Sequence, residues 1–525
     1  MKSGMLVAVT AALLVLTAAA RADVEISRKP TSNMSCDSGV CTATAQKAVL
    51  NVSDLATMLA SGDVAVKTGS LAKDIDIYQP LQWTSTSRLT LDAERSVTVK
   101  KPVTVSGTGA VTIETNDGSG NDDLLFANKG SLTFWDTSSS LIIGGRTYTL
   151  VKDIAALAAD IANNFAGSYA LANSYDAKHD RFDNVPIPTD FYGTFEGLGQ
   201  SILHLKLKRS TKCKIVPADR CEGFFAALGS TAIVRDLKLS KVNISYSDAR
   251  WVGGLAGLSL GTIKNISVDG GIHGSGGPNT YAGGLLGGNQ GGNVVSTEAV
   301  VSVSGDGVST VGGLIGGNFG DVANSHASGD VSGGDYIGGL AGVGYNFFQC
   351  YATGSVTSGD GTTIGGLVGS EVGTIAQSYA TGAVVAGNDN ARAGGLVGAG
   401  SGISNSYATG SVTGGSHKNE IGGLAGEGFT ITLSYSIGAV GGRGGSAVGG
   451  FIGKSGGRGN QQDYWDTDTS GTSQGCGRGG DCSGLSGLTS EQLQSGLPAG
   501  FDPKIWGQSP SINNGYPYLL ANPPR

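Results

Sequence analysis

The pentapeptide Gly253-Gly254-Leu255-Ala256-Gly257 decides the fold, because the same phrase returns at a nearly constant interval along the chain. Successive copies lie 30, 29, 26, 27, 29, 28 and 27 residues apart, with first glycines at Gly253, Gly283, Gly312, Gly338, Gly365, Gly394, Gly422 and Gly449. A unit of about 28 residues is too short to bury its own apolar face, so repeats of this length stack on their neighbours. The period therefore predicts a solenoid.

Composition supports an ordered repeat. The 525-residue chain contains 89 glycines, well above the usual share of about 7%, but they recur periodically between Val, Ile and Leu. That placement excludes collagen and low-complexity disorder. Lys and Arg number 35 against 42 Asp and Glu, for a net charge of -7, so no large basic field is available and we expect no nucleic-acid partner.

Each phrase is followed by a strand that reads Tyr-Ala-Thr-Gly-x-Val at 351–356, 379–384 and 407–412. The Ala and Val positions stay apolar from repeat to repeat, whereas Ser267, Glu298 and His326 share the Tyr position. Mixed polarity at one strand position indicates that it faces water. We therefore expect Ala and Val in the core and an outward ladder of tyrosines, with the glycine pairs supplying positive φ at corners and close approach of coils.

The outward Tyr/Thr stripe is the candidate binding site, since aromatic faces and hydroxyls can stack on sugar rings and hydrogen-bond to them. The alternative is that these side chains only stabilise the sheet by cross-coil stacking. The predicted ligand-binding residues are Tyr351, Thr353, Tyr379, Thr381, Tyr407, Thr409 and Tyr435.

Residues 1–22 have the pattern of a secretory signal: Lys2, an apolar run over 6–19 and the small-x-small site Ala20-Arg21-Ala22. A membrane anchor is the alternative, but a span needs about 20 apolar residues. We expect a secreted or cell-surface protein, with the periplasm as the other destination, and no transmembrane anchor once the signal is removed.

Changes of pattern divide the remaining chain into five parts. Helical spacing at 53–60, 151–165 and 490–494 predicts three short helices among the strands. Ser53 is the expected N-cap of the first, and Phe165 lies on the apolar face of the second. The predicted parts are an N-terminal cap with irregular β-rich coils (23–145), a helix-containing insertion (146–200), lead-in coils (201–250), the repeat solenoid (251–460) and a C-terminal cap (461–525).

Seven cysteines fit an oxidising compartment, because six of them form close pairs along the chain. The predicted disulfides are Cys36 with Cys41, Cys213 with Cys221, and Cys476 with Cys482. Cys350 is left over at a repeat position that is otherwise Ser378, Ser406 and Ser434. We interpret Cys350 as a small core residue rather than a reactive thiol.

Catalytic groupings are missing from the sequence. Acids in the repeats fall at different repeat positions, so stacking brings together no carboxylate pair of the kind that glycoside hydrolysis needs. The acidic groups Asp117/Asp122/Asp123 and Asp463/Asp466/Asp468 are interpreted as solvated turns rather than calcium sites. We expect no enzyme activity, no cofactor and no metal site.

The phrase Gly-Gly-Leu-x-Gly followed by Ser-Tyr-Ala-Thr-Gly-x-Val resembles the GLUG repeat of bacterial secreted and surface proteins, including filamentous-haemagglutinin-like adhesins. The resemblance extends to Thr194–Gly199 and to Tyr464–Gly471. It implies a right-handed parallel β-helix. The predicted fold is therefore all-β, a solenoid of about 28-residue coils with a short helical insertion and terminal caps.

Export and the uncharged repeated surface favour a non-catalytic protein that mediates adhesion or contacts a glycan, a matrix component or a cell surface. Two alternatives stay open. One is a carbohydrate-active β-helix enzyme of the lyase or hydrolase class, and the other is a purely structural spacer.

Overall fold

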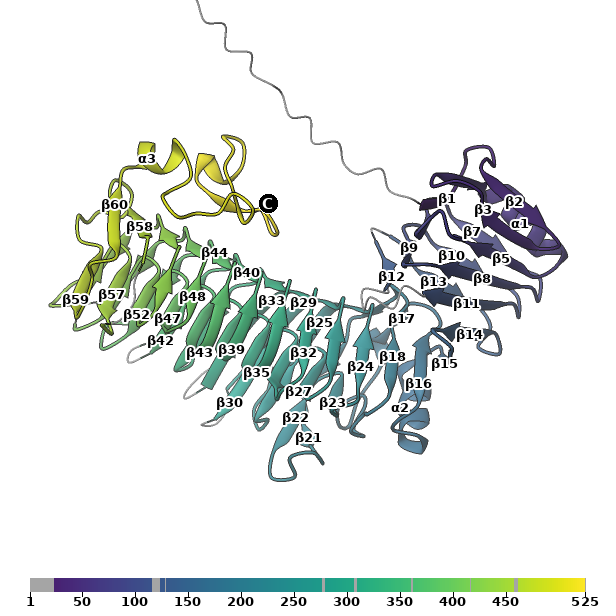
Figure 1. The fold of residues 1–525 in the computed structure, drawn as a ribbon. Helices are drawn as coiled ribbons and strands as arrows, with labels where there is room; N and C mark the ends of the chain where they lie inside the picture. Colours follow the sequence, from purple (N-terminus) through teal and green to yellow (C-terminus); the bar gives the residue numbers. More distant parts are fainter. Residues whose placement is uncertain are drawn as a thin grey trace, which may run out of the picture. The chain divides into compact units, whose positions relative to one another are not determined.

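The computed structural model describes residues 23–115, 123–127, 129–275, 279–305, 309–359, 362–415, 417–457 and 461–524 (Figure 1). The predicted signal segment and the acidic residues Asp117 and Asp122 lie outside these ranges. Over the described ranges strands predominate, and the α-helices are α1 (Val52–Ser61), α2 (Ile154–Asn163) and α3 (Ser490–Gln494). No helix within those ranges is long and apolar enough to cross a membrane.

The chain divides into two compact units, Met1–Ser131 with Ser139–Arg146, and Leu132–Ser138 with Thr147–Arg525. The first unit contains parallel strands whose side chains alternate between core and solvent, as at Leu89, Leu91, Val111 and Ile113. Its first sheet contains β1 (Asp23–Ser27), β4 (Ala48–Asn51), β6 (Asp74–Ile77), β9 (Ser96–Val99) and β12 (Asp123–Phe126). Its second contains β3 (Val40–Ala43), β5 (Val64–Lys67), β8 (Arg88–Ala93), β11 (Ala110–Thr115) and β14 (Ser140–Ile143), with β2 (Met34–Asp37) antiparallel to β3. β7 (Leu81–Trp83) pairs with β10 (Val103–Val105).

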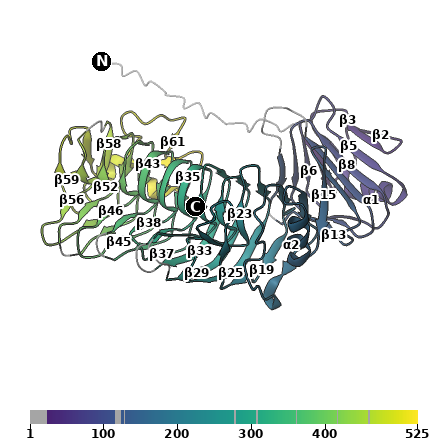
Figure 2. The same cartoon turned by 90° about the horizontal axis from the view of Figure 1, so that it is seen from below.

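The second unit contains the repeats, and each coil contributes strands to three parallel sheets. Tyr351, Tyr379, Tyr407 and Tyr435 are register partners in successive coils, 28 residues apart. The predicted all-β solenoid with this spacing is confirmed. Figure 2 shows one face of the unit, where strands of successive coils follow one another in sequence order. This face includes β25 (Lys238–Tyr246), β29 (Ser267–Gly274), β33 (Glu298–Gly305), β36 (His326–Ala327), β40 (Tyr351–Ala352), β44 (Tyr379–Ala380), β49 (Tyr407–Ala408), β54 (Tyr435–Ser436) and β58 (Asp463–Asp466).

Two further faces precede this one within each coil, and the phrase Gly-Gly-apolar-x-Gly bridges them. In the first, the repeat strands end on the first glycine of each pair. It contains β21 (Thr211–Lys212), β22 (Arg220–Glu222), β26 (Trp251–Gly253), β30 (Thr280–Gly283), β34 (Ser309–Gly312), β38 (Tyr336–Gly338), β42 (Thr363–Gly365), β46 (Arg392–Gly394), β51 (Glu420–Gly422) and β56 (Ala447–Gly449). In the second, each repeat strand begins three residues after that glycine. It includes β27 (Ala256–Ser259), β31 (Leu286–Asn289), β35 (Ile315–Ala323), β39 (Ala341–Phe348), β43 (Val368–Ala376), β47 (Val397–Gly400), β52 (Ala425–Gly428), β57 (Ile452–Ser455) and β59 (Cys476–Gly479).

The repeat glycines are required because the next coil leaves no room for a side chain, not because of their backbone conformation. A Cβ on Gly339 would lie 2.1 Å from the carbonyl oxygen of Gly366 in the next coil, and the other paired glycines are similarly crowded. The expectation of positive φ at these glycines is wrong, since the described repeat phrases contain none. Positive φ at the coil corner belongs instead to one non-glycine residue per coil: Asn265, Ser296, Asn324, Gln349, Gln377, Asn405 and Leu433.

The predicted apolar positions face the core. Ala352 and Val356, with their partners Ala380 and Val384, are fully buried. Two residues before each of these alanines lies a buried residue of what we call the hydroxyl column. From Ser378 onward, each side-chain oxygen in this column accepts the backbone N–H of the residue at the same repeat position one coil earlier. The bonds are Cys350 N to Ser378 Oγ (3.0 Å), Ser378 N to Ser406 Oγ (3.2 Å), Ser406 N to Ser434 Oγ (3.1 Å) and Ser434 N to Asp463 Oδ1 (2.9 Å). Cys350 is a buried free thiol in this column, as its repeat position predicts.

The three helices lie where their spacing predicts, with differences at the ends. Asn51, not Ser53, caps α1, because its side chain accepts the N–H groups of Ser53 and Asp54. Asp153 caps α2, which ends at Asn163, so the expected contribution of Phe165 is wrong: Phe165 lies beyond the helix and is 53% exposed. All three predicted disulfides are formed, with Cα–Cα distances of 4.0, 5.7 and 6.3 Å.

Candidate functional site

The predicted tyrosine ladder exists. Ring centroids of Tyr351 and Tyr379 lie 4.9 Å apart, those of Tyr379 and Tyr407 4.8 Å, and those of Tyr407 and Tyr435 5.1 Å, with nearly parallel planes. His326 continues the stack, 4.4 Å from Tyr351. One ring per coil at the strand spacing produces this arrangement.

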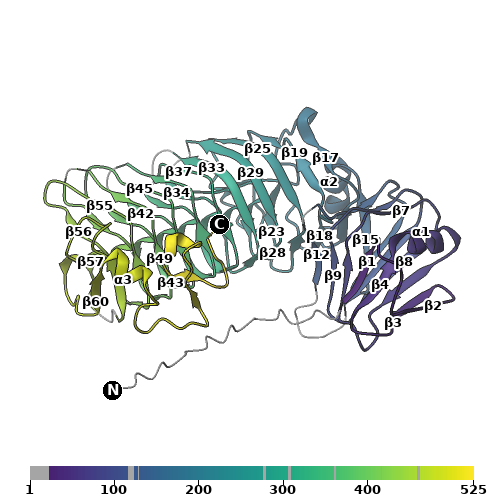
Figure 3. The same cartoon turned by 90° about the horizontal axis from the view of Figure 1, so that it is seen from above.

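The expectation that this ladder faces water is wrong for three of its tyrosines. Tyr379, Tyr407 and Tyr435 are 1%, 0% and 0% exposed, because the C-terminal segment packs over them (Figure 3). Trp506 stacks against Phe501 at 4.5 Å and donates its indole N–H to Asn405 Oδ1 at 3.2 Å. The hydroxyl of Tyr435 donates to the carbonyl of Pro517 at 2.6 Å.

What remains accessible is a fragment of the predicted stripe. Tyr351 is half-buried, Thr353 is exposed, and Thr381 and Thr409 are half-buried. These residues therefore offer no continuous aromatic surface for a glycan, and cross-coil stacking accounts for the ladder.

The C-terminal acids are structural as well. Asp463 and Asp466 are fully buried, so their interpretation as solvated turns is wrong. Asp466 accepts hydrogen bonds from Ser490 Oγ (2.7 Å) and Tyr516 OH (2.8 Å), and burial raises the pKa of Asp463 to about 8. Across the described residues no group of three or more His, Cys, Asp or Glu side chains is arranged to hold a metal ion.

A different site lies at the N-terminal end of the repeats, in a groove of about 580 Å³ that we call the aromatic groove. One wall is the disulfide-closed loop between β21 and β22, and the other is formed by residues of β26, β27, β30 and β35 and the end of β31. Its lining residues are Ile215, Val216, Asp219, Arg250, Trp251, Leu258, Leu260, Tyr281, Gln290 and Phe319.

Two stacked rings form the floor of the aromatic groove. Trp251 and Tyr281 lie 4.5 Å apart with an interplanar angle of 15°. Glycine at the facing repeat position makes room for each ring, since a Cβ on Gly288 would lie 2.5 Å from Trp251 and one on Gly317 2.8 Å from Tyr281. Trp251 is only 5% exposed, whereas Tyr281 is half-buried and Phe319 is 37% exposed.

Polar groups hold the loop wall in place. Asp219 accepts the indole N–H of Trp251 at 3.0 Å and pairs with Arg250 Nη1 at 3.1 Å. The carboxylate of Asp190 accepts the backbone N–H of Ile215 at 2.7 Å, and burial raises the pKa of Asp190. The wall is therefore fixed by a disulfide, an ion pair and hydrogen bonds.

Sequence reasoning missed this groove, although the repeat carried a signal. Its rings stand two residues before the first glycine of a phrase (Trp251, Tyr281) or seven after it (Phe319). Tyr336 repeats the first pattern, while Tyr345 and Phe429 repeat the second. Aligning those positions would have predicted an aromatic surface, but the loop that encloses it lies outside the repeat.

Towards the C-terminus the position two residues before the phrase becomes charged, at Arg392 and Glu420, and so does the facing position five residues after its first glycine, at Glu427 and Lys454. Arg392 and Lys454 both pair with Glu427, at 2.9 and 2.7 Å, and Arg478 pairs with Glu420 at 2.5 Å. The hydrogen bond to Glu427 raises the pKa of Lys454. Because these charges neutralise one another across coils, we interpret them as a structural ion-pair network.

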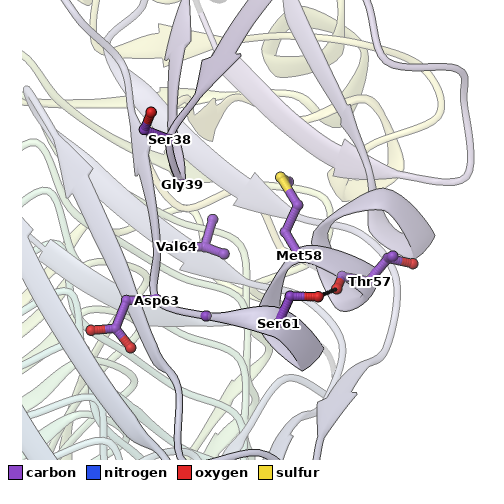
Figure 4. Close-up of a pocket in the computed structure, with 8 residues that line it drawn as sticks. Ser38, Gly39, Thr57, Met58, Ser61, Asp63 and Val64 are labelled. Carbon is purple, nitrogen blue, oxygen red and sulfur yellow. Dashed lines mark hydrogen bonds between the residues drawn. The ribbon is translucent and has the colours of Figure 1, made fainter.

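The first unit has a pocket of about 680 Å³ beside α1 (Figure 4). Met58 and Val64 provide its apolar side chains, and Ser61 donates to the carbonyl of Thr57 at 3.3 Å. Asp63 accepts the backbone N–H of Arg88 at 2.8 Å. This lining contains no aromatic ring, so it offers less for recognition than the aromatic groove.

Comparison with known proteins identifies the repeat. Residues 307–332 match the family described as the GLUG motif. Halomucin of Haloquadratum walsbyi (strain DSM 16790 / HBSQ001) is 28% identical over 257 residues, which are 49% of this chain and 2% of that protein. The predicted resemblance to GLUG-repeat proteins is confirmed, and the chain is a GLUG-containing β-solenoid that spans a very small part of this relative's length.

A solved structure provisionally described as an immunoglobulin A1 protease, from Bacteroides ovatus, is 17% identical and aligns with a TM-score of 0.31. The alignment covers 71% of this chain and 92% of that one. Similarity at this level supports no inference about activity.

Proposed function

We propose that this protein is a surface-associated, non-catalytic solenoid that contacts glycan on a matrix or a cell through the aromatic groove. The observation that carries the proposal is the groove itself, where Tyr281 and Phe319 present accessible ring surface beside Gln290, Asp219 and Arg250. Ligand sites of this kind have volumes of about 300–1,000 Å³ and combine apolar rings with a few polar groups. Rings bind the apolar faces of sugars, and the polar groups meet their hydroxyls.

The groove chemistry favours binding over catalysis. Among the residues that line it, Asp219 is the one carboxylate, and it is engaged by Trp251 and Arg250. Glycoside hydrolysis needs two carboxyl groups about 5–10 Å apart, one of them free to transfer a proton. The proposal therefore assigns recognition, not bond cleavage, to this site.

A glycan array and a cell-binding assay with the full chain test the proposal. Tyr281→Ala and Phe319→Ala are expected to weaken binding by about tenfold each, the equivalent of about 1.4 kcal/mol per ring. Trp251 is left intact because its ring packs into the groove floor. Phe429→Ala is the matched control, since Phe429 occupies the same repeat position as Phe319 and is 44% exposed.

Three outcomes would overturn the proposal. The first is that the full chain binds no glycan, and the second is that the groove variants bind as tightly as the unaltered chain. The third is cleavage of a bound glycan, which would make the protein an enzyme.

A further inference from the structure

We infer that the ligand is an uncharged linear polysaccharide that lies lengthwise across five successive coils, rather than a short sugar held in the groove alone. This inference rests on the proposed function and specifies its ligand. It is carried by a row of side chains that begins in the aromatic groove and continues beyond it. We call this the outer row: Leu260, Gln290, Phe319, Tyr345 and Val372.

The outer row is continuous with the groove and accessible outside it. Leu260, Gln290 and Phe319 line the groove. Tyr345 and Val372, in the next two coils, are 42% and 62% exposed, and the rings of Phe319 and Tyr345 lie 5.8 Å apart. The apolar surface thus extends two coils past the end of the groove.

Strand register places these side chains one coil apart. Each follows directly after a strand residue that is paired with its counterpart in an adjacent coil: Ser259, Asn289, Asn318, Gly344 and Glu371. Adjacent parallel strands are about 4.8 Å apart. One sugar of an extended chain advances by nearly the same distance, so successive sugars would meet successive members of the outer row.

A rigid polar layer supports the row. Asn289 and Asn318 are fully buried, and Asn289 Nδ2 donates to Asn318 Oδ1 at 2.7 Å. Asn289 Oδ1 also accepts the N–H of Gly292 at 3.0 Å, and Glu371 accepts the N–H of Ser401 at 2.9 Å. These bonds fix the turns that present the outer row, which lowers the ordering cost of binding a long ligand.

The charge along this stretch selects against an acidic or basic polymer. The outer row consists of three apolar side chains, one phenol and one amide, and the two charged residues that line the groove, Asp219 and Arg250, are paired with each other. An ionic ligand would lose hydration here without gaining a counter-charge. An uncharged linear glycan fits this surface.

The test compares mono- to hexasaccharides of β-1,4-glucose, β-1,3-glucose and β-1,4-N-acetylglucosamine, by calorimetry on the full chain. At least one series is expected to bind about tenfold more tightly as a pentasaccharide than as a disaccharide. Tyr345→Ser is expected to remove that gain and to leave disaccharide affinity unchanged. Serine is accepted at this repeat position, where residue 401 is Ser. Phe429→Ser, four coils from Phe319 at the same position, is the control.

The outcomes separate the two proposals. The linear-ligand inference is overturned if affinity is already maximal for a disaccharide, or if Tyr345→Ser keeps the full gain with length. It is also overturned if the chain binds only branched or acidic glycans on the glycan array. Each of these results leaves the groove as a glycan site. Absence of binding to any glycan overturns both.

Discussion

At the scale of single residues, the repeat glycines show how closely the coils approach. Gly339 has an ordinary φ but no room for a methyl group, because the nearest obstacles are the backbone of Gly366 and the Cβ of Ala352 at 2.9 Å. Backbone atoms of a paired strand cannot move aside as a flexible side chain can. The glycine signal in the sequence thus reports contact between coils.

Replacing Gly339 by Ala is expected to lower the free energy of unfolding by about 1–3 kcal/mol or more, the usual cost of overpacking. Gly359→Ala is the matched control, since a Cβ on Gly359 would meet nothing within 4 Å and its φ is not positive. Denaturant titration of both variants measures the difference. Equal stability of the two would contradict the packing explanation.

Glu222 is an acidic residue at a repeat position that is otherwise apolar. It is fully buried and both its carboxylate oxygens are without a hydrogen-bond partner. Its register partners in the following coils are Val252, Ala282 and Val311, so it occupies a core position. Burial raises the pKa of Glu222 from 4.5 to about 8.

This shift predicts a pH dependence with a definite sign. Between pH 4.5 and about 8 the unfolded chain releases the Glu222 proton while the folded chain keeps it, so stability falls as pH rises. Glu222→Leu is expected to remove on the order of 4 kcal/mol of that fall. Unfolding curves across this pH window measure the slope.

Glu298 provides the contrast, because its hydrogen bond with His326 lowers its pKa to about 2. Glu298→Gln is expected to lower stability by a constant amount above pH 4.5, where the slope stays unchanged, and to remove the loss of stability between pH 4.5 and about 2. A slope in Glu222→Leu equal to that of the unaltered chain would show that the carboxyl is solvated in the folded state.

At the scale of elements, the C-terminal segment is held to the coils by contacts between residues far apart in the chain. Trp506 and Asn405 are 101 residues apart, and Tyr435 and Pro517 are 82. No local pattern indicates such contacts, so the sequence predicted a cap at 461–525 but not the surface that it covers. The exposure assigned to Tyr379, Tyr407 and Tyr435 was wrong for that reason.

Trp506→Ala is expected to destabilise this docking by about 3–5 kcal/mol, because Trp506 is 1% exposed and contacts Tyr407, Tyr435 and Phe501. Limited proteolysis should then cleave within 490–524 much faster. Trp135→Ala, at a tryptophan that is 66% exposed, should leave the cleavage rate unchanged. Resistance of the Trp506 variant would contradict the packing role of its indole.

The role of the loop between β21 and β22 can be tested by removing the Cys213–Cys221 disulfide, which closes a segment with a sequence separation of 8. The Cys213→Ser/Cys221→Ser variant is expected to lose about 2–3 kcal/mol of loop stability. Glycan affinity should fall with it, because this loop forms one wall of the aromatic groove. The matched control is Cys36→Ser/Cys41→Ser in the first unit, which should keep full glycan affinity. Equal affinity of both variants would show that the loop is not part of the binding site.

Helices illustrate what local pattern can and cannot predict. The spacing of Ile154, Leu157 and Ile161 predicted α2 and its buried face. Its end was misplaced by two residues because Phe165 continues the helical spacing after the hydrogen bonds stop.

The aromatic groove was missed because its two walls come from different parts of the chain, a repeat and a loop that precedes it.

At the scale of the whole molecule, the second unit is a linear array in which each coil contacts its neighbours. The repeat period alone predicted this architecture, since only stacking buries the apolar positions of so short a unit. The first unit lacks such a period. Its strands could be predicted from alternation, but their order within each sheet could not.

In a linear array, a destabilising substitution is expected to weaken only its own coil and the adjacent coils. In Gly339→Ala, amide hydrogen exchange is expected to accelerate in the coils that contain Gly313, Gly339 and Gly366. Amides near Tyr435 should retain their protection, because several intact coils separate them from the substitution. Uniform acceleration along the second unit would indicate instead that it unfolds as one cooperative block.

The buried hydroxyl column also has a consequence for how such a chain can evolve. Each hydroxyl of this column, in Ser378, Ser406 and Ser434, accepts a backbone N–H from the preceding coil. It also donates to a backbone carbonyl two residues earlier in its own coil. A duplicated coil inserted among them would therefore find matching partners on both sides. Asp463 accepts the last of these N–H groups with Oδ1, and its buried Oδ2 has no hydrogen-bond partner, so the pattern of the serine hydroxyls stops at this residue. Gene duplication can therefore lengthen the array from within the part that carries these serines.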